Sequence, residues 1–332
     1  MCIRDSCLSC FFSGIGKTRT VMVSALAAAT VNIAVNYILI FGKWGAPALG
    51  IRGAAYGTIL GSVCGLLVLA AVYLSGRTQR HFQIFQSFRY DGPLMKKLWR
   101  YGYPPGLELF LNLLAFDVLI LNFHACGPAT AAAVTIVFNW DMVSFVPLIG
   151  VHIGVTSLVG RYMGARLPDL ADRAAFSGLK LAFLYTACTF AAFLFFPGPL
   201  VHVFQPPEGD ALFAQTAPDA IFMLRLTALY VMADAIMLVF GGALRGAGDT
   251  FWAMCVSVTM HWILVAGQVI LLRILNLSAR WTWVFLCLLL LVFSGLFYQR
   301  YRGGKWRQIR VIEEPYEPTP PPVDGLHETK DL

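Results

Sequence analysis

Eight apolar stretches, each long enough to cross a bilayer as a helix, restrict what this 332-residue chain can fold into. An α-helix needs about 20 apolar residues to cross roughly 30 Å of hydrocarbon. The stretches are residues 21–41, 54–74, 105–123, 131–159, 177–196, 221–243, 253–272 and 281–298. The sequence therefore predicts an all-α polytopic membrane protein with eight transmembrane helices.

Composition agrees with a chain that lives in the lipid bilayer. Hydrophobic residues make up 58% of it, charged residues 13%, and the mean hydropathy is +0.68, well outside the averages of soluble proteins. The fourth stretch is long for one span and contains Pro147, which predicts a kink or an extension beyond the bilayer.

The distribution of lysine and arginine predicts the orientation, because basic loops tend to stay in the cytoplasm. One set of connections carries only Lys43, Arg52, Arg273 and Arg280. The opposite set carries Lys17, Arg19, Arg77, Arg80, Arg89, Lys96, Lys97, Arg100, Arg161, Arg166, Arg173, Arg245, Arg300, Arg302, Lys305, Arg307 and Arg310. Both termini are therefore expected in the cytoplasm and the protein in the cytoplasmic membrane. This asymmetry accounts for the net charge of +7, and no nucleic-acid partner is expected.

The stretch SGIGKTRT, residues 13–20, resembles part of a phosphate-binding loop but lacks a required glycine. A full loop needs glycine five residues before the Gly-Lys pair, and that position is Phe11. A second segment, Gly246-Ala-Gly-Asp-Thr250, lies 232 residues later and also leads into an apolar span. The pair indicates tight turns within an internal repeat, as in transporters built from two related halves.

The repeat also predicts missing spans. Shifting residues 105–243 back by 232 places most of them before Met1, so we expect an N-terminally truncated fragment of a twelve-span protein. A native eight-span protein is the alternative. The first ten residues, MCIRDSCLSC, lack the apolar core of a signal peptide and are expected to be a non-native or irregular leader.

The eight cysteines predict neither a disulfide framework nor a metal site. Most lie singly within spans, where cysteine packs as a small apolar residue. Cys7 and Cys10 have metal-ligand spacing, but only Cys2 lies nearby as a further ligand. No cofactor is expected.

The residues resemble the multidrug and toxic compound extrusion (MATE) family. The resemblance rests on FFSGIGKTRT, NIAVNYILIFG with Asn32 and Asn36, PALGIRGAAYGT, YGYPPGLELFLNLLAF, VPLIGVHIGVTSLVGRYMGA and MADAIMLVFGGALRGAGDT. These segments occur in the order of the family's fifth to twelfth helices. The resemblance implies two six-helix lobes around a cleft, alternating access, and export of small amphiphilic or cationic substrates in exchange for Na⁺ or H⁺. A monomer is expected.

The resemblance also divides the chain. After the leader at 1–10, residues 11–76 would form the last two helices of the N-terminal lobe, 77–102 a cytoplasmic linker, and 103–302 the six-helix C-terminal lobe. Residues 303–332 are expected to be a disordered cytoplasmic tail, because the part from Glu313 is rich in proline and acidic residues.

Four carboxylates lie well inside the predicted spans: Glu108, Asp117, Asp141 and Asp234. An intramembrane acid costs roughly 2.5 to 3.5 kcal/mol on insertion scales, so such residues usually have a function. Asp234 is the strongest candidate for ion or proton coupling, because Tyr230 lies one turn earlier on the same helix face.

The family comparison implies that Asp234 and Tyr230 match a coupling pair in the tenth helix, with Na⁺ a possible ligand of the two. Where cation-coupled members carry a glutamate in the seventh helix, this chain has Asn112, and Glu108 one turn earlier is expected to replace it. Asp117, Asn139 and Asp141 are weaker candidates.

Two other functions stay open. A flippase for lipid-linked saccharides shares the two-lobe architecture, and a membrane enzyme or receptor without a transport role is the third possibility. The sequence shows no nucleophile-base pair, so we do not expect an enzyme.

Overall fold

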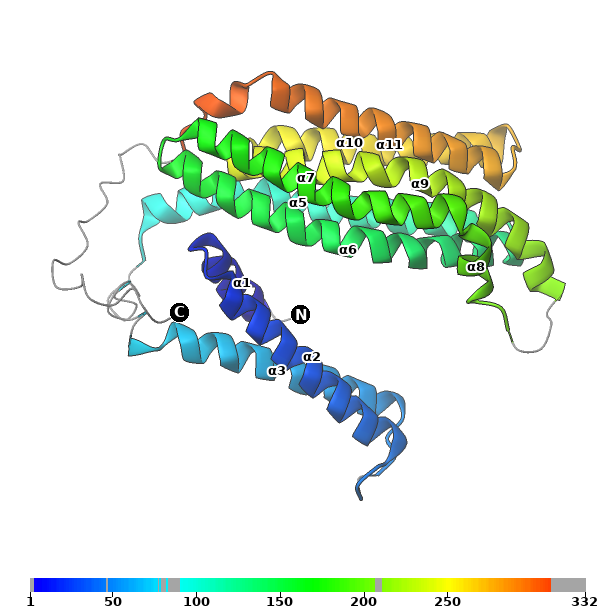
Figure 1. Cartoon of the computed structure of the whole chain (residues 1–332), viewed down its shortest axis with the longest axis horizontal. Helices are drawn as coiled ribbons and strands as arrows, with labels where there is room; N and C mark the ends of the chain where they lie inside the picture. Colours follow the sequence, from blue (N-terminus) through cyan, green and yellow to red (C-terminus); the bar gives the residue numbers. More distant parts are fainter. Residues whose placement is uncertain are drawn as a thin grey trace. The chain divides into compact units, whose positions relative to one another are not determined.

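The computed structural model describes residues 3–45, 47–76, 78, 82, 90–206 and 211–311. The described chain is helical throughout and has no strand (Figure 1). Its helices are α1 (Ile3–Gly14), α2 (Thr18–Phe41), α3 (Ile51–Tyr73), α5 (Gly92–His124), α6 (Pro128–Gly164), α7 (Pro168–Phe195), α8 (Pro197–His202), α9 (Ala211–Gly246), α10 (Thr250–Val269), the π-helix η1 (Ile270–Ile274), α11 (Ala279–Arg302) and the 3₁₀-helix η2 (Lys305–Gln308).

The eight predicted spans are confirmed. Eight helices of the described chain are long and apolar enough to cross a membrane: α2, α3, α5, α6, α7, α9, α10 with η1, and α11. Pro147 lies inside α6, which continues through it as a single helix of 37 residues.

The chain forms two compact units, Met1–Leu107 and Glu108–Leu332. The division falls within α5, close to the expected start of the second lobe at residue 103. Much of the expected linker at 77–102 lies outside the described residues, namely 77, 79–81 and 83–89.

Both ends of the described chain are more ordered than the sequence predicted. Helix α1 covers most of the expected irregular leader, and Phe12 near its end is fully buried. The expected disorder is wrong for residues 303–311. There the Trp306 ring is buried and stacks on Tyr301 with ring centroids 5.0 Å apart, so one aromatic side chain holds the segment. Residues 312–332 lie outside the described chain.

In the first unit, α2 and α3 pack almost backbone to backbone. Glycines recur every fourth residue on one face of α3, at positions 53, 57, 61 and 65. A Cβ atom at Gly53 would lie 2.7 Å from the Leu39 carbonyl oxygen, and one at Gly61 would lie 2.8 Å from that of Ala28. Small residues at such spacing let membrane helices approach closely, so this stripe explains the pairing.

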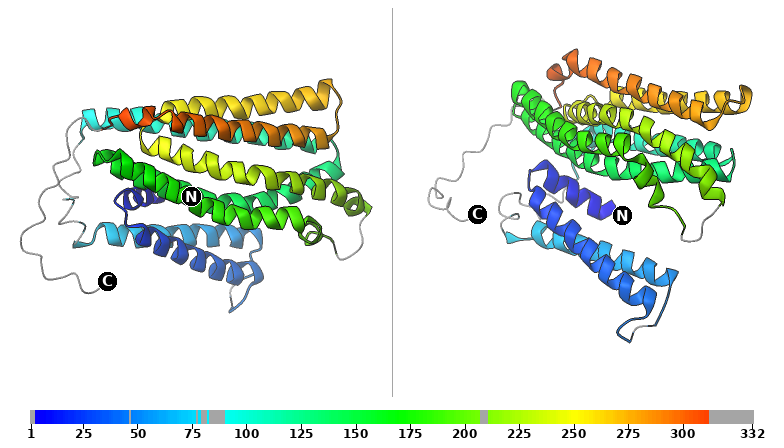
Figure 2. Two further views of the ribbon diagram at one scale, coloured as in Figure 1. Left: turned by 45° about the horizontal axis from the view of Figure 1, so that its top comes forward. Right: turned by 45° about the vertical axis from the view of Figure 1, so that its right-hand side comes forward.

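The second unit is built around α9. Half of the residues in the apolar window of α9 are buried, against 39% or less in each of the other spans. Helix α9 packs against α6, α7 and α11 (Figures 1 and 2). Two clusters of buried side chains lie along it, one around Tyr230 and Trp283 and the other around Phe240 and Phe297.

The contact between α6 and α9 also depends on glycines, which have no side chain to keep the two backbones apart. A Cβ atom at Gly242 would lie 2.8 Å from the His152 carbonyl oxygen, and one at Gly246 would lie 2.5 Å from that of Thr156. Gly242 and Gly246 are one turn apart on α9, so the two helices touch along a continuous line.

We predict that Gly246→Ala destabilises the second unit by about 1–3 kcal/mol, because the new methyl group meets backbone atoms that cannot rotate away. The measurement is the unfolding of the detergent-solubilised protein, compared with Gly154→Ala on α6. A Cβ atom at Gly154 meets nothing within 4 Å, so this control should be neutral or slightly stabilising. Equal stability of the two variants would contradict the packing described.

Candidate functional site

Two groups of polar side chains lie at different depths along α9. The aspartate cluster consists of Asp141, Tyr230 and Asp234, and the arginine cluster consists of Glu108, His152 and Arg245. Asp234 and Arg245 are 11 residues apart on α9, which places their Cα atoms about 16 Å apart along the helix axis.

The aspartate cluster joins α6 to α9. Asp141 on α6 is 8% exposed, while Asp234 and Tyr230 on α9 are 7% and 2% exposed. The Asp141 carboxyl lies near Tyr230 and Asp234. Cys287 on α11 adjoins the cluster. The structure thus brings two carboxyl groups together deep in the bundle.

The packing of α6 on α9 determines which residues of the two helices lie close together in the aspartate cluster. Tyr230 and Asp234 lie one turn apart, which puts them on one face of α9. One end of the interface is fixed where Gly246 approaches Thr156. Both helices run in the same direction, and Gly242 and Gly246 on α9 approach His152 and Thr156 on α6 with the same difference in residue number. The same difference places Asp141 opposite the part of α9 that carries Tyr230.

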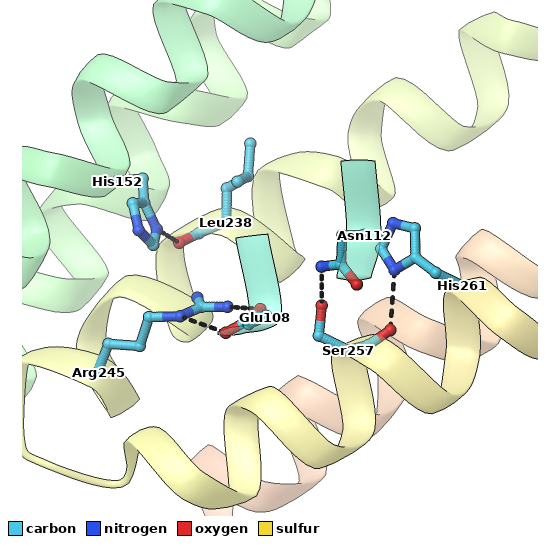
Figure 3. A network of polar contacts seen from close by, with 7 residues as sticks. All are labelled: Glu108, Asn112, His152, Leu238, Arg245, Ser257 and His261. Atoms are coloured by element: carbon cyan, nitrogen blue, oxygen red, sulfur yellow. Dashed lines mark hydrogen bonds and ion pairs between the residues drawn. The ribbon is translucent and has the colours of Figure 1, made fainter. Parts of the chain in front are cut away.

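The arginine cluster is a buried ion pair with further hydrogen bonds around it (Figure 3). Arg245 Nε donates to Glu108 Oε2 at 3.3 Å, and Arg245 Nη2 pairs with Glu108 Oε1. The side chains of Arg245 and Glu108 are 19% and 7% exposed. His152 Nδ1 lies 2.7 Å from the Leu238 carbonyl oxygen. The carboxylate of Glu108 is therefore neutralised by a specific partner.

Asn112 lies one turn from Glu108 on α5 and also has a partner on another helix. Its Nδ2 donates to Ser257 Oγ on α10 at 2.8 Å, and His261 Nδ1 lies 2.8 Å from the Ser257 carbonyl oxygen (Figure 3). Within the described ranges, no contact joins Glu108 or Asn112 to Asp234. The structure does not bring these two candidates into the aspartate cluster.

The remaining candidates lie elsewhere. Asp117 on α5 and Asn139 on α6 are exposed, and Asn139 Nδ2 donates to the Thr135 carbonyl oxygen of its own helix at 2.8 Å. Neither residue meets Asp141 or Asp234 in the described chain.

The contacts of Asn122 and Gln268 on the polar face of α5 were not predicted from the sequence. Asn122 donates to Gln268 Oε1 at 3.3 Å, and the buried Gln268 donates to the Leu119 carbonyl oxygen at 3.0 Å. With Glu108 and Asn112, these contacts tie α5 to α9 and α10 at three levels. Polar residues at helical spacing on one face of an apolar span are the sequence pattern that could have predicted these contacts.

Comparison with known proteins shows related chains. The MatE family model matches residues 104–267. A probable multidrug resistance protein NorM from Pasteurella multocida is 27% identical over 76% of this chain and 54% of its own length. Multidrug resistance protein MdtK from Yersinia enterocolitica is 31% identical over 79% and 55%. A probable NorM from Thermotoga maritima is 26% identical over 92% and 64%. The chain thus spans little more than half to about two thirds of the length of these relatives.

Solved structures share the fold. A MOP superfamily transporter from Pyrococcus furiosus is 20% identical, with a TM-score of 0.74 over 87% of this chain and 63% of that one. A MATE protein crystallised in the straight conformation is 19% identical, with a TM-score of 0.78 over 90% and 65%.

The eight spans and the buried polar interior define a multi-pass membrane protein with the fold of these transporters. Residues 104–267, just under half of the chain, match the MatE family.

We predict that Glu108→Gln lowers stability by about 3–5 kcal/mol, because it leaves the Arg245 guanidinium buried without a counter-charge. The double variant Glu108→Gln/Arg245→Gln removes both charges and should recover most of the loss. Thermal unfolding of the purified protein measures both.

The same pair of variants separates structure from coupling. If Glu108→Gln keeps wild-type stability, the ion pair does not support the fold, and Glu108 returns as a candidate coupling group.

Proposed function

We propose that the protein takes part in cation-coupled export of small amphiphilic or cationic compounds, with Na⁺ or H⁺ as the coupling ion. The observation that carries the proposal is the aspartate cluster: two carboxyl groups and a phenol lie buried among spans, without a basic partner in the described chain. The names of the NorM and MdtK relatives, multidrug resistance proteins, support this substrate class.

The cluster suits an exchanger for a physical reason. A buried carboxylate without a counter-charge is costly, so binding of a proton or cation strongly stabilises the conformation that encloses it. A ligand shifts a conformational equilibrium by its difference in affinity for the two states. Asp234, assisted by Tyr230, is the principal coupling group in this proposal. Glu108 serves as the structural counter-charge of Arg245.

We further propose that both termini face the cytoplasm, as the basic loops indicate. With the other cysteines replaced, Cys126 in the exposed turn between α5 and α6 should react with an impermeant maleimide from outside. A cysteine at Asp169, on the first turn of α7, should react only after permeabilisation.

The labelling has a pH dependence of its own. Partial burial raises the pKa of the Cys126 thiol, and the nearby Arg273 lowers it by a smaller amount. Since the thiolate is the nucleophile, labelling should accelerate as the pH rises. If the maleimide labels Asp169→Cys but not Cys126 in intact cells, the orientation of the protein is the reverse of the one proposed.

We predict that Asp234→Asn abolishes gradient-driven drug efflux and leaves expression and drug binding largely intact. Asparagine keeps the size and hydrogen-bonding capacity of aspartate but cannot titrate. Efflux from everted vesicles under an imposed ion gradient is the measurement. Asp169→Asn, at an 87% exposed side chain, is the control, and Asp117→Asn should reduce efflux less than Asp234→Asn. Wild-type efflux by Asp234→Asn would remove Asp234 from the coupling mechanism.

A further inference from the structure

We propose that the start of α7 and the segment after α11 (residues 303–311) together form a docking surface for the headgroups of anionic phospholipids. The surface, called the basic patch, consists of the side chains of Arg166, Arg173, Arg302, Lys305 and Arg310. The inference goes beyond the proposed function and does not depend on it.

The structure fixes two distant segments of the chain side by side. The Tyr301 hydroxyl, in the last turn of α11, donates to Asp172 Oδ1 on α7 at 2.6 Å, although the two residues are 129 positions apart. Arg307 Nη2 lies 3.4 Å from the same oxygen. The buried Trp306 ring stacks on Tyr301, and its Nε1 donates to the Tyr301 carbonyl oxygen at 2.9 Å. The end of α11 and the start of α7 therefore lie together at one end of the second unit (Figures 1 and 2).

This arrangement gathers positive charge. Residues 166–173 and 300–310 together carry seven lysine and arginine side chains and only two carboxylates. Two of the seven, Arg300 and Arg307, pair with aspartates. The other five are the basic patch, and they are exposed and form no ion pair among the described residues. The contacts between α7 and the end of α11 thus leave five neighbouring positive charges without a counter-charge.

The basic patch lies next to the apolar part of two spans. Arg302 is the last residue of α11, and Arg173 precedes the apolar stretch at 177–196 by four residues, or about 6 Å along the helix axis. Basic clusters beside a membrane span attract anionic lipids, and each basic residue near the surface strengthens this attraction roughly fivefold. Guanidinium groups also match phosphate oxygens in geometry. An anionic headgroup therefore supplies the missing counter-charge.

The tendency of basic residues to lie at one end of membrane spans does not explain the basic patch by itself. That tendency concerns how many basic residues each loop carries, and it does not require two distant segments to be held together. Here a buried indole ring and a short hydrogen bond fix the two segments in place. Like charges held close together repel one another, so a bound anion stabilises this arrangement.

The test is a lipid titration of thermal stability. The full chain, with any upstream sequence that its genomic locus encodes, is purified in detergent micelles that contain phosphatidylglycerol or phosphatidylcholine with the same acyl chains. The wild-type melting temperature should rise with phosphatidylglycerol and change little with phosphatidylcholine. Added salt should weaken the rise, because it screens exposed charges. Inorganic phosphate should not reproduce it, because only the lipid is concentrated at the micelle surface beside the protein.

Two double variants remove charge from either side of the basic patch. They are Arg302→Gln/Lys305→Gln on the α11 side and Arg166→Gln/Arg173→Gln on the α7 side. Each should raise the phosphatidylglycerol concentration at half-saturation by at least about tenfold, because two charges are lost. All four side chains are exposed, so both variants should fold as the wild type does.

The matched control is Lys96→Gln/Lys97→Gln, which removes two exposed charges at the start of α5 in the first unit. It should keep the wild-type response. An equal loss in this control would show that overall charge, and not the basic patch, attracts the lipid, and would overturn the proposal.

Four further results would also overturn it. They are an absent or equal response of the wild type to the two lipids, a wild-type response in either patch variant, and the same rise with inorganic phosphate. The fourth is a response that appears only after removal of residues 312–332, because the acidic tail and not a lipid would then neutralise the basic patch.

Discussion

The close approach of α6 and α9 is the constraint on which the second unit depends. Glycines at 242 and 246 let the α9 backbone reach the carbonyl oxygens of α6, and this contact sets the register between the helices. The register then determines which polar groups meet. Asp141 faces Tyr230 and Asp234, and farther along the interface His152 faces Leu238. A slip of one residue would rotate the facing side chains by about 100° and separate the aspartates.

Helix α9 carries two kinds of buried charged group, one in each cluster. Glu108 and Arg245 neutralise each other. Loss of one partner would lower the stability of the protein, because the other charge would stay buried without a counter-charge. Asp141 and Asp234 share the same sign and lie together. A protein gains nothing in stability from two like charges in its core, so a group of this kind points to ion binding. The ion pair holds α5 to α9, and in our proposal the aspartate pair responds to the ion gradient.

The sequence was sufficient for the spans and for one side of the site. Runs of about 20 apolar residues identify membrane helices because the bilayer fixes their length, and all eight appear in the structure. Spacing within one helix joined Tyr230 to Asp234. The partner of Glu108 could not be found this way, because Arg245 lies 137 residues away and the pairing depends on tertiary packing. For the same reason Asp141 was only a weaker candidate from the sequence. The buried Trp306, which holds the segment after α11, was not predicted either.

The central claim is that Asp234 in the aspartate cluster binds the coupling ion, and infrared difference spectroscopy tests it most directly. The signal is the carbonyl stretch of protonated carboxyl groups, recorded when Na⁺ is added to the purified protein or the pH is raised. The account predicts that at least one of these changes reduces the band in the wild type and that Asp234→Asn removes the effect. An effect that persists in Asp234→Asn, or that disappears only with Glu108→Gln, would contradict it.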